Sequence, residues 1–117
     1  MGLVLWIDRN TFATGLLEKA FKKKSLSFYS LENAKDFAYL VDDLKPQVLV
    51  FDEQTLLTDL ESFQAQYSQN ALMKSLPVIL VDSQGKLEFI QNKIGDLKRP
   101  FDPFQIPAII ENLLKKN

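Results

Sequence analysis

Short apolar runs alternate with amphipathic segments along the 117-residue chain. The nearly unbroken apolar runs lie at 3–7, 48–51 and 78–81, with a shorter one at 26–29. Such runs are typical of strands that are buried on both faces of a parallel sheet. The segments between them place apolar residues at helical spacing, at 12–21, 34–41 and 60–67. The pattern therefore predicts that each strand is followed by a helix.

The C-terminal segment is expected to form a last helix over 103–116, with its isoleucines and leucines on the inner side. Pro107 conflicts with a helix already under way at Pro103, so the helix should be kinked or begin near Ile106. With a fifth strand before it, residues 1–117 are predicted to form a single α/β domain. Its fold is a doubly wound five-stranded parallel sheet flanked by five helices.

Three aspartates are each the first polar residue after an apolar run: Asp8, Asp52 and Asp82. In a parallel α/β sheet the functional groups gather at the carboxyl ends of the strands. We therefore expect these three carboxylates to converge in one pocket at that edge of the sheet.

The composition excludes several kinds of catalytic, metal-binding and nucleotide-binding site. The chain has no cysteine and no histidine, which excludes thiol nucleophiles, imidazole bases and zinc sites of the usual kind. Its four glycines form neither a dinucleotide-binding loop nor a P-loop, and an enzyme is the least favoured class. A net charge of −1 gives no general attraction to nucleic acid, so the lysine runs at 22–24 and 115–116 are interpreted as solvated helix ends. With no apolar stretch of ~20 residues and no basic leader, a cytoplasmic protein without membrane contact is expected.

Three motifs, in order and spacing, resemble the receiver domain of two-component response regulators over essentially the whole chain. Pro-Gln-Val-Leu-Val-Phe-Asp at 46–52 is similar to the third strand with its phosphoacceptor, which corresponds to Asp52. The segment 71–79 resembles the loop and strand that come next. Leu-Lys-Arg-Pro-Phe-Asp-Pro at 97–103 resembles the fifth strand, the Lys-Pro-Phe motif and the start of the last helix. The resemblance implies a flavodoxin-like receiver fold.

The residues that match the receiver's phosphorylation pocket depart from the family pattern. The family's pair of acids that helps to hold Mg²⁺ corresponds to Asp8 and Arg9, so the second acid is replaced by a cation. The family's hydroxyl residue at the end of the fourth strand corresponds to Asp82, with Ser83 beside it. Its lysine corresponds to Arg99, which is followed by Pro100. The chain between 82 and 99 is also short, which predicts a fourth helix of about one turn.

These changes indicate a pocket that replaces its metal by built-in cations. Three carboxylates face two arginines, Arg9 and Arg99, and an arginine–carboxylate fork should lock one conformation. Phosphorylating Asp52 would add up to two negative charges beside Asp82, at ~4 kcal/mol for each like-charge pair near 4 Å. No cofactor and no Mg²⁺ binding are expected. The alternative is that Arg9 points to solvent and the carboxylates still bind Mg²⁺ weakly.

The predicted function is a phosphorylation-independent pseudo-receiver that acts through protein–protein contacts in a bacterial two-component-type pathway. Its partner would be another signalling protein, an effector domain beyond Asn117, or a second copy of the chain. The expected contact surface is formed by the fourth helix, fifth strand and fifth helix, and its apolar candidates are Phe89, Ile90, Phe104 and Ile106. Two other functions stay open: a conventional receiver phosphorylated on Asp52 by a histidine kinase, and a small-ligand sensor that uses the strand-end crevice.

Overall fold

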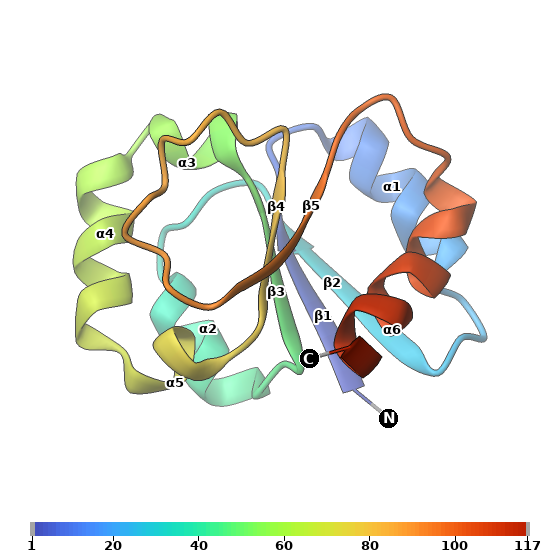
Figure 1. Cartoon of the computed structure of the whole chain (residues 1–117), viewed down its shortest axis with the longest axis horizontal. Coiled ribbons are helices and arrows are strands. Elements are labelled where there is room, and N and C mark those ends of the chain that lie inside the picture. Colours follow the sequence, from blue (N-terminus) through green and yellow to red (C-terminus); the bar gives the residue numbers. More distant parts are fainter. Residues whose placement is uncertain (1, 117) are drawn as a thin grey trace.

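The computed structural model describes residues 2–116 and contains one parallel sheet between two layers of helices (Figure 1). The strands are β1 (Gly2–Ile7), β2 (Leu26–Leu31), β3 (Val48–Asp52), β4 (Val78–Val81) and β5 (Lys93–Leu97). Their order across the sheet is β2-β1-β3-β4-β5, and every neighbouring pair is parallel. The predicted doubly wound, five-stranded parallel sheet is confirmed.

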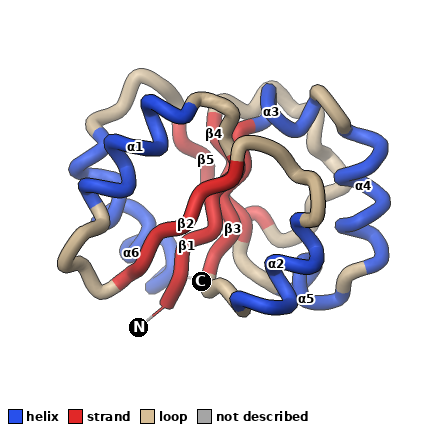
Figure 2. Tube along the Cα trace, turned by 180° about the vertical axis from the view of Figure 1, so that it is seen from behind, coloured by secondary structure: helices blue, strands red, loops and turns tan. Residues whose placement is uncertain are grey.

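Two helices cover one face of the sheet and four cover the other (Figures 1 and 2). The first layer holds α1 (Thr11–Ala20) and α6 (Ile106–Lys116), with a 3₁₀ turn, η1 (Pro103–Gln105), before α6. The second layer holds α2 (Phe37–Leu44), α3 (Glu53–Leu57), α4 (Leu60–Gln69) and α5 (Ala71–Ser75). The chain thus crosses to a different layer after β2 and again after β5.

The core consists of two apolar clusters, one on each face of the sheet. Because strand side chains alternate, Trp6 packs toward α1 and α6, whereas Ile7 and Phe51 pack toward the other layer. Phe51 meets Phe63 of α4 in an edge-to-face pair with ring centroids 5.1 Å apart. Each of these side chains is fully buried. Burying one large apolar side chain stabilises the fold by about 2 kcal/mol. The sheet is therefore a rigid base for the polar groups at its carboxyl edge.

The helices differ from the prediction in number and position. Six α-helices, not five, lie within residues 2–116, because the expected third helix is flanked by the short helices α3 and α5. The expected fourth helix is wrong: residues 82–92 join β4 to β5 as an irregular segment with one turn at 88–89. Its backbone is held by side chains of the second helix layer, and Gly85 has a left-handed φ of 79°. The fifth strand also begins upstream of the Leu-Lys-Arg-Pro-Phe motif.

The last helix follows the prediction. It begins at Ile106, after the 3₁₀ turn, and Pro107 lies in its first turn, where a missing N–H removes no helical hydrogen bond. The helix packs closely on β5 at Gly95, where an added Cβ would lie 2.8 Å from the Leu113 Cδ1 atom. Glycine at this position thus allows the helix to approach the strand.

Candidate functional site

Four charged side chains meet at the carboxyl edge of the sheet. Asp8 follows β1, Asp52 ends β3, Asp82 follows β4, and Arg99 lies two residues beyond β5. The Arg99 guanidinium donates to all three carboxylates: through Nη2 to Asp8 Oδ2, and through Nη1 to Asp52 Oδ1 and Asp82 Oδ2, both at 3.0 Å. The predicted convergence of the three aspartates is confirmed. We call this group the Arg99 cluster.

Both carboxylate oxygens of Asp52 are engaged. Oδ1 accepts the hydrogen bond from Arg99, whereas Oδ2 accepts from the Thr55 amide at 3.2 Å and the Thr55 hydroxyl at 2.7 Å. Asp52 is thus the N-cap of α3 as well as a partner of Arg99. The Thr55 hydroxyl oxygen also accepts from the Arg9 amide at 2.9 Å, which ties the end of β1 to α3. A buried carboxylate with these partners is held in one orientation.

Asp8 is almost completely buried and has two further hydrogen-bond contacts. Its Oδ1 accepts from the Asn10 amide at 2.9 Å, and the Trp6 indole Nε1 lies 3.4 Å from Oδ2 as a donor. Burial raises the pKa of Asp8 above its ordinary value, although the Asn10 amide and the Arg99 charge act in the opposite direction. Because Trp6 contacts the site through its indole, its fluorescence should report changes in the Arg99 cluster.

Asp82 holds Arg99 from two sides. Its backbone adopts a left-handed conformation with a φ of 53°, which aspartate tolerates better than most residues. Its Oδ1 accepts from the Arg99 amide at 2.8 Å, while Oδ2 accepts from the guanidinium. Partial burial tends to raise the pKa of Asp82, but the hydrogen bonds and charge of Arg99 outweigh it and lower that pKa. Burial likewise tends to lower the pKa of Arg99, and the bonds to Asp52 and Asp82 outweigh it, so Arg99 stays cationic.

The lowered pKa of Asp82 predicts how the protein responds to acid. The pKa of Asp82 is lower in the folded protein than in the unfolded chain, so at pH values between the two the unfolded chain binds more protons. The stability that Asp82 contributes is therefore lost as pH falls through the folded-state pKa. Asp82→Asn should therefore flatten the loss of the urea midpoint below about pH 4. Asp8 contributes in the opposite direction, because its pKa is raised. An unchanged acid slope in Asp82→Asn would show that the Arg99 pairing does not stabilise the fold.

Three other residues predicted for the pocket lie elsewhere. The Arg9 side chain is exposed and makes no ion pair with any residue between 2 and 116, so only its amide takes part and its predicted role as a pocket cation is wrong. The Ser83 hydroxyl donates to Glu53 Oε2 at 3.2 Å rather than to a member of the Arg99 cluster. Pro100 is exposed and follows a cis peptide bond at Arg99. The cluster thus holds three carboxylates and one guanidinium.

Glu53 is the main residue that sequence reasoning missed. It follows Asp52 directly, is fully buried, and accepts from the amides of Gln84 at 2.9 Å and Lys86 at 3.2 Å. These bonds hold the segment after β4 against α3. Thr55 was also missed, although an aspartate followed three residues later by a threonine is compatible with a helix cap. Nothing in the pattern around Glu53 distinguishes it from a solvated acid in a first helical turn.

The predicted contact surface is mostly part of the core. Ile90 and Ile106 are buried, so their assignment to an exposed surface is wrong. Phe89 is half-buried and packs its ring on Phe63 and Tyr67, with centroids 6.0 and 5.5 Å away. Phe104, in η1, is exposed by 60% and is the candidate that a partner could reach.

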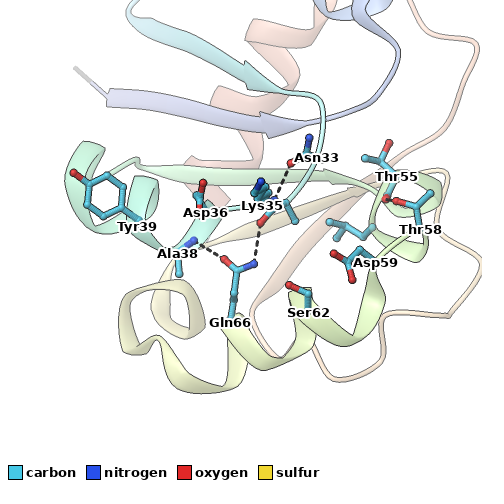
Figure 3. A pocket seen from close by; sticks show the side chains of 12 residues that line it. Asn33, Lys35, Asp36, Ala38, Tyr39, Thr55, Thr58, Asp59, Ser62 and Gln66 are labelled. Carbon is cyan, nitrogen blue, oxygen red and sulfur yellow. Dashed lines mark hydrogen bonds between the residues drawn. The ribbon is translucent and has the colours of Figure 1, made fainter.

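Two larger open grooves lie near the site. One, of about 570 Å³, lies beside Arg99 and is lined by residues on both sides of it: Gln54, Asp82, Ser83, Gln84, Asp96, Leu97 and Lys98. The other, of about 680 Å³, lies between the segment before α2 and the helices α3 and α4 (Figure 3). There the Gln66 amide bridges the Ala34 carbonyl and the Ala38 amide, both at 2.8 Å. Lys35, Asp36 and Asp59 are exposed in this second groove, so water screens their charges.

The described part of the chain shows neither a cluster of metal ligands nor a membrane-spanning helix. Between residues 2 and 116, no group of three or more acidic side chains is arranged to hold a metal ion. In the same range, every helix is too short or too polar to cross a bilayer.

Comparison with known proteins identifies the fold. No protein-family model matches the chain, and no curated protein matches it. Among solved structures, the receiver domain of nitrogen regulatory protein C is similar, with 24% identity, a TM-score of 0.73, and coverage of 98% of this chain and 95% of that one. A response regulator from Desulfuromonas acetoxidans is 16% identical with a TM-score of 0.73, and the match covers 99% of this chain and 98% of that one. An orphan response regulator of H. pylori is 22% identical with a TM-score of 0.69, and the match covers 97% of this chain and 96% of that one.

The chain has the fold of a receiver domain. The Arg99 cluster lies at the carboxyl edge of this sheet, and it includes Asp52, the residue that the resemblance of 46–52 matches to a phosphoacceptor. At these identities the similarity establishes the fold and not the function.

Proposed function

We propose that this receiver fold works without phosphorylation, as a protein–protein interaction module of a bacterial two-component-type pathway. The proposal rests mainly on Asp52, whose two carboxylate oxygens are both occupied, by Arg99 and by Thr55. A phosphoacceptor needs a free oxygen and a neutralising metal beside it. Here the Arg99 guanidinium supplies positive charge at Oδ1, and Oδ2 is committed to capping α3.

The energetics of the Arg99 cluster support the same conclusion. A phosphoryl group on Asp52 would add up to two negative charges to a site that already contains three carboxylates and one guanidinium. The nearest carboxylates, on Asp8 and Asp82, would repel it by ~4 kcal/mol each at about 4 Å in a partly buried site. Arg99 would also have to leave Asp52, which breaks the partly buried ion pair. Transfer to Asp52 is thus opposed by both repulsion and lost pairing.

A module locked in this way would act through its surface. Phe104 and Phe12 are the large exposed apolar side chains near the Arg99 cluster, and an open apolar groove between α1 and the segment 99–103 lies beside them. The partner is proposed to be another signalling protein or an effector domain, with no catalytic step in this chain and no Mg²⁺ requirement. One of the similar structures is that of an orphan response regulator.

The test is whether Mg²⁺ and beryllofluoride, a mimic of the phosphoryl group, bind at Asp52. We expect no saturable change in Trp6 fluorescence or in the amide NMR signals around Asp52, because Arg99 and Thr55 occupy its oxygens. A saturable, Mg²⁺-dependent change centred on Asp52 would overturn the proposal in favour of a conventional receiver.

A matched variant controls this experiment. Arg9→Asp, Asp82→Thr and Arg99→Lys together restore the residue types that the receiver pattern has at these positions, and remove the arginine fork. This triple variant should respond to Mg²⁺ and beryllofluoride while the wild-type protein does not. Native circular dichroism of both proteins would show that the comparison is between folded molecules.

A further inference from the structure

The free edge of β2 is the surface that the proposed function leaves unused. β2 is the last strand on one side of the sheet, and Figure 2 shows it between the helices α1 and α2. Its Tyr29 is 46% exposed, and Phe28 is half-buried. An uncovered edge strand offers a row of hydrogen-bonding groups to another strand.

The register shows which backbone groups of β2 are free. The Asp8 amide donates to the Leu31 carbonyl at 2.8 Å, so Leu31 directs its backbone groups toward β1. Because this direction alternates along a strand, Tyr29 and Ser27 also face β1, whereas Leu26, Phe28 and Ser30 face outward. None of these three residues bonds its outward groups to another residue of the described range 2–116. Three donors and three acceptors are thus available at this edge.

The opposite edge of the sheet is protected by devices that β2 lacks. β5 carries the exposed ion pair of Lys93 and Asp96, at 2.9 Å, and its pairing with β4 has an irregularity at Val78. Charges and irregularities of this kind discourage edge-to-edge association. By contrast, β2 contains no charge, no proline and no irregularity in its pairing.

Charges at the two ends of β2 are complementary to each other. Lys24 precedes the strand and Glu32 follows it, and both are exposed. β2 ends at Leu26 and Leu31, and both charged residues lie in the bends just beyond it. In an antiparallel pairing with a second copy centred on Phe28, Lys24 of each chain would therefore come to the same end of the interface as Glu32 of the other. This register also places the outward-facing residues opposite one another, Phe28 against Phe28 and Leu26 against Ser30, as hydrogen-bonded pairs require. A shift of two residues loses the Lys24–Glu32 match.

We propose that two copies of this chain associate through antiparallel pairing of their β2 edges. The contact is a closed two-fold interface that continues the sheet from five strands to ten, with roughly six new backbone hydrogen bonds. The two Phe28 rings, each already stacked on Phe21 of its own chain at 5.0 Å, form a cross-strand aromatic pair. The proposal does not depend on the chemistry of Asp52.

The experiment is sedimentation equilibrium of the wild-type protein from micromolar to millimolar concentration, beside charge-reversed variants. We expect a monomer–dimer equilibrium in the wild type. Lys24→Glu and Glu32→Lys should each weaken it roughly tenfold, because like charges then face each other at both ends. The double variant, and an equimolar mixture of the two single variants, should recover dimer formation because opposite charges again meet.

A second variant tests the backbone contribution directly. Ser30→Pro removes one outward N–H of β2 without removing a bond to β1, and it should abolish the dimer while the circular dichroism spectrum stays native. A protein that remains monomeric at all concentrations overturns the proposal. This outcome covers the alternative that the β2 edge pairs with a strand of a different protein. A dimer that survives Ser30→Pro, or that the charge reversals do not affect, places the interface elsewhere and equally overturns it.

Discussion

Arg99→Ala is expected to lower the free energy of unfolding at neutral pH by about 3 kcal/mol, because it leaves the carboxylates of the Arg99 cluster without their cation. Asp8 is almost fully buried and Asp52 nearly so, and their mutual repulsion would no longer be offset. Burial already raises the pKa of Asp8, and without the Arg99 charge this pKa should rise further. The variant would then gain stability from Asp8 as pH falls from 7 through that raised pKa.

Urea denaturation with and without millimolar Mg²⁺ measures this effect. In Arg99→Ala, Mg²⁺ should raise the midpoint, because three carboxylates facing one vacated position can bind a hard cation, whereas the wild-type midpoint should not move. Arg9→Ala is the control: its side chain is exposed and unpaired within the described chain, so the change should stay within about 0.5 kcal/mol. If both alanine variants unfold alike, Arg99 does not organise the cluster.

Glu53→Ala is also expected to destabilise the protein by about 3 kcal/mol. The substitution leaves the amides of Gln84 and Lys86 and the Ser83 hydroxyl without their buried charged acceptor, and hydrogen bonds to a charged group are worth about 1.5–3 kcal/mol each. Water can reach the exposed segment 84–86 and recover part of this loss. The damage should therefore be largest in the segment after β4 rather than in the sheet.

Hydrogen exchange measured by NMR distinguishes this local effect from general instability. In Glu53→Ala the amides of Gln84 and Lys86 should exchange much faster, while amides in the centre of β3 change only as the overall stability does. Glu61→Ala, an exposed acid in the first turn of α4, is the matched control and should change neither. Unaltered exchange at positions 84 and 86 would show that Glu53 does not hold this segment.

The apolar runs were sufficient to predict the three central strands, because β1, β3 and β4 are buried on both faces and contain almost no polar residue. β5 could not be found in this way. It is an edge strand with the sequence Lys-Ile-Gly-Asp-Leu, in which only Leu97 is buried, so its pattern resembles a loop. The expected fourth helix failed for a related reason: residues 82–92 obtain their hydrogen bonds from Glu53 and Tyr67, which are distant in sequence.

The positions of site residues could be predicted where the end of a strand fixes them. They could not be predicted where a contact with a side chain distant in sequence fixes them. Asp8, Asp52 and Asp82 follow strands whose ends are aligned, so topology brings them together. Arg9 is adjacent to Asp8, but the Thr55 hydroxyl holds its amide and its side chain is left in solvent. Likewise, the spacing of Ile106 and Phe104 cannot show that the 3₁₀ turn buries the first and exposes the second.

The close approach at Gly95 has a consequence for anything covalently joined to α6. The end of the Leu113 side chain fills the space that a Cβ at position 95 would occupy, so a methyl group there would first have to displace this side chain. Only a residue too large for a moved Leu113 side chain would press on the helix itself, while the carboxylates of the Arg99 cluster stayed in place. The packing between α6 and β5, on which the position of an attached segment depends, can therefore be changed at residue 95 without altering the charged site.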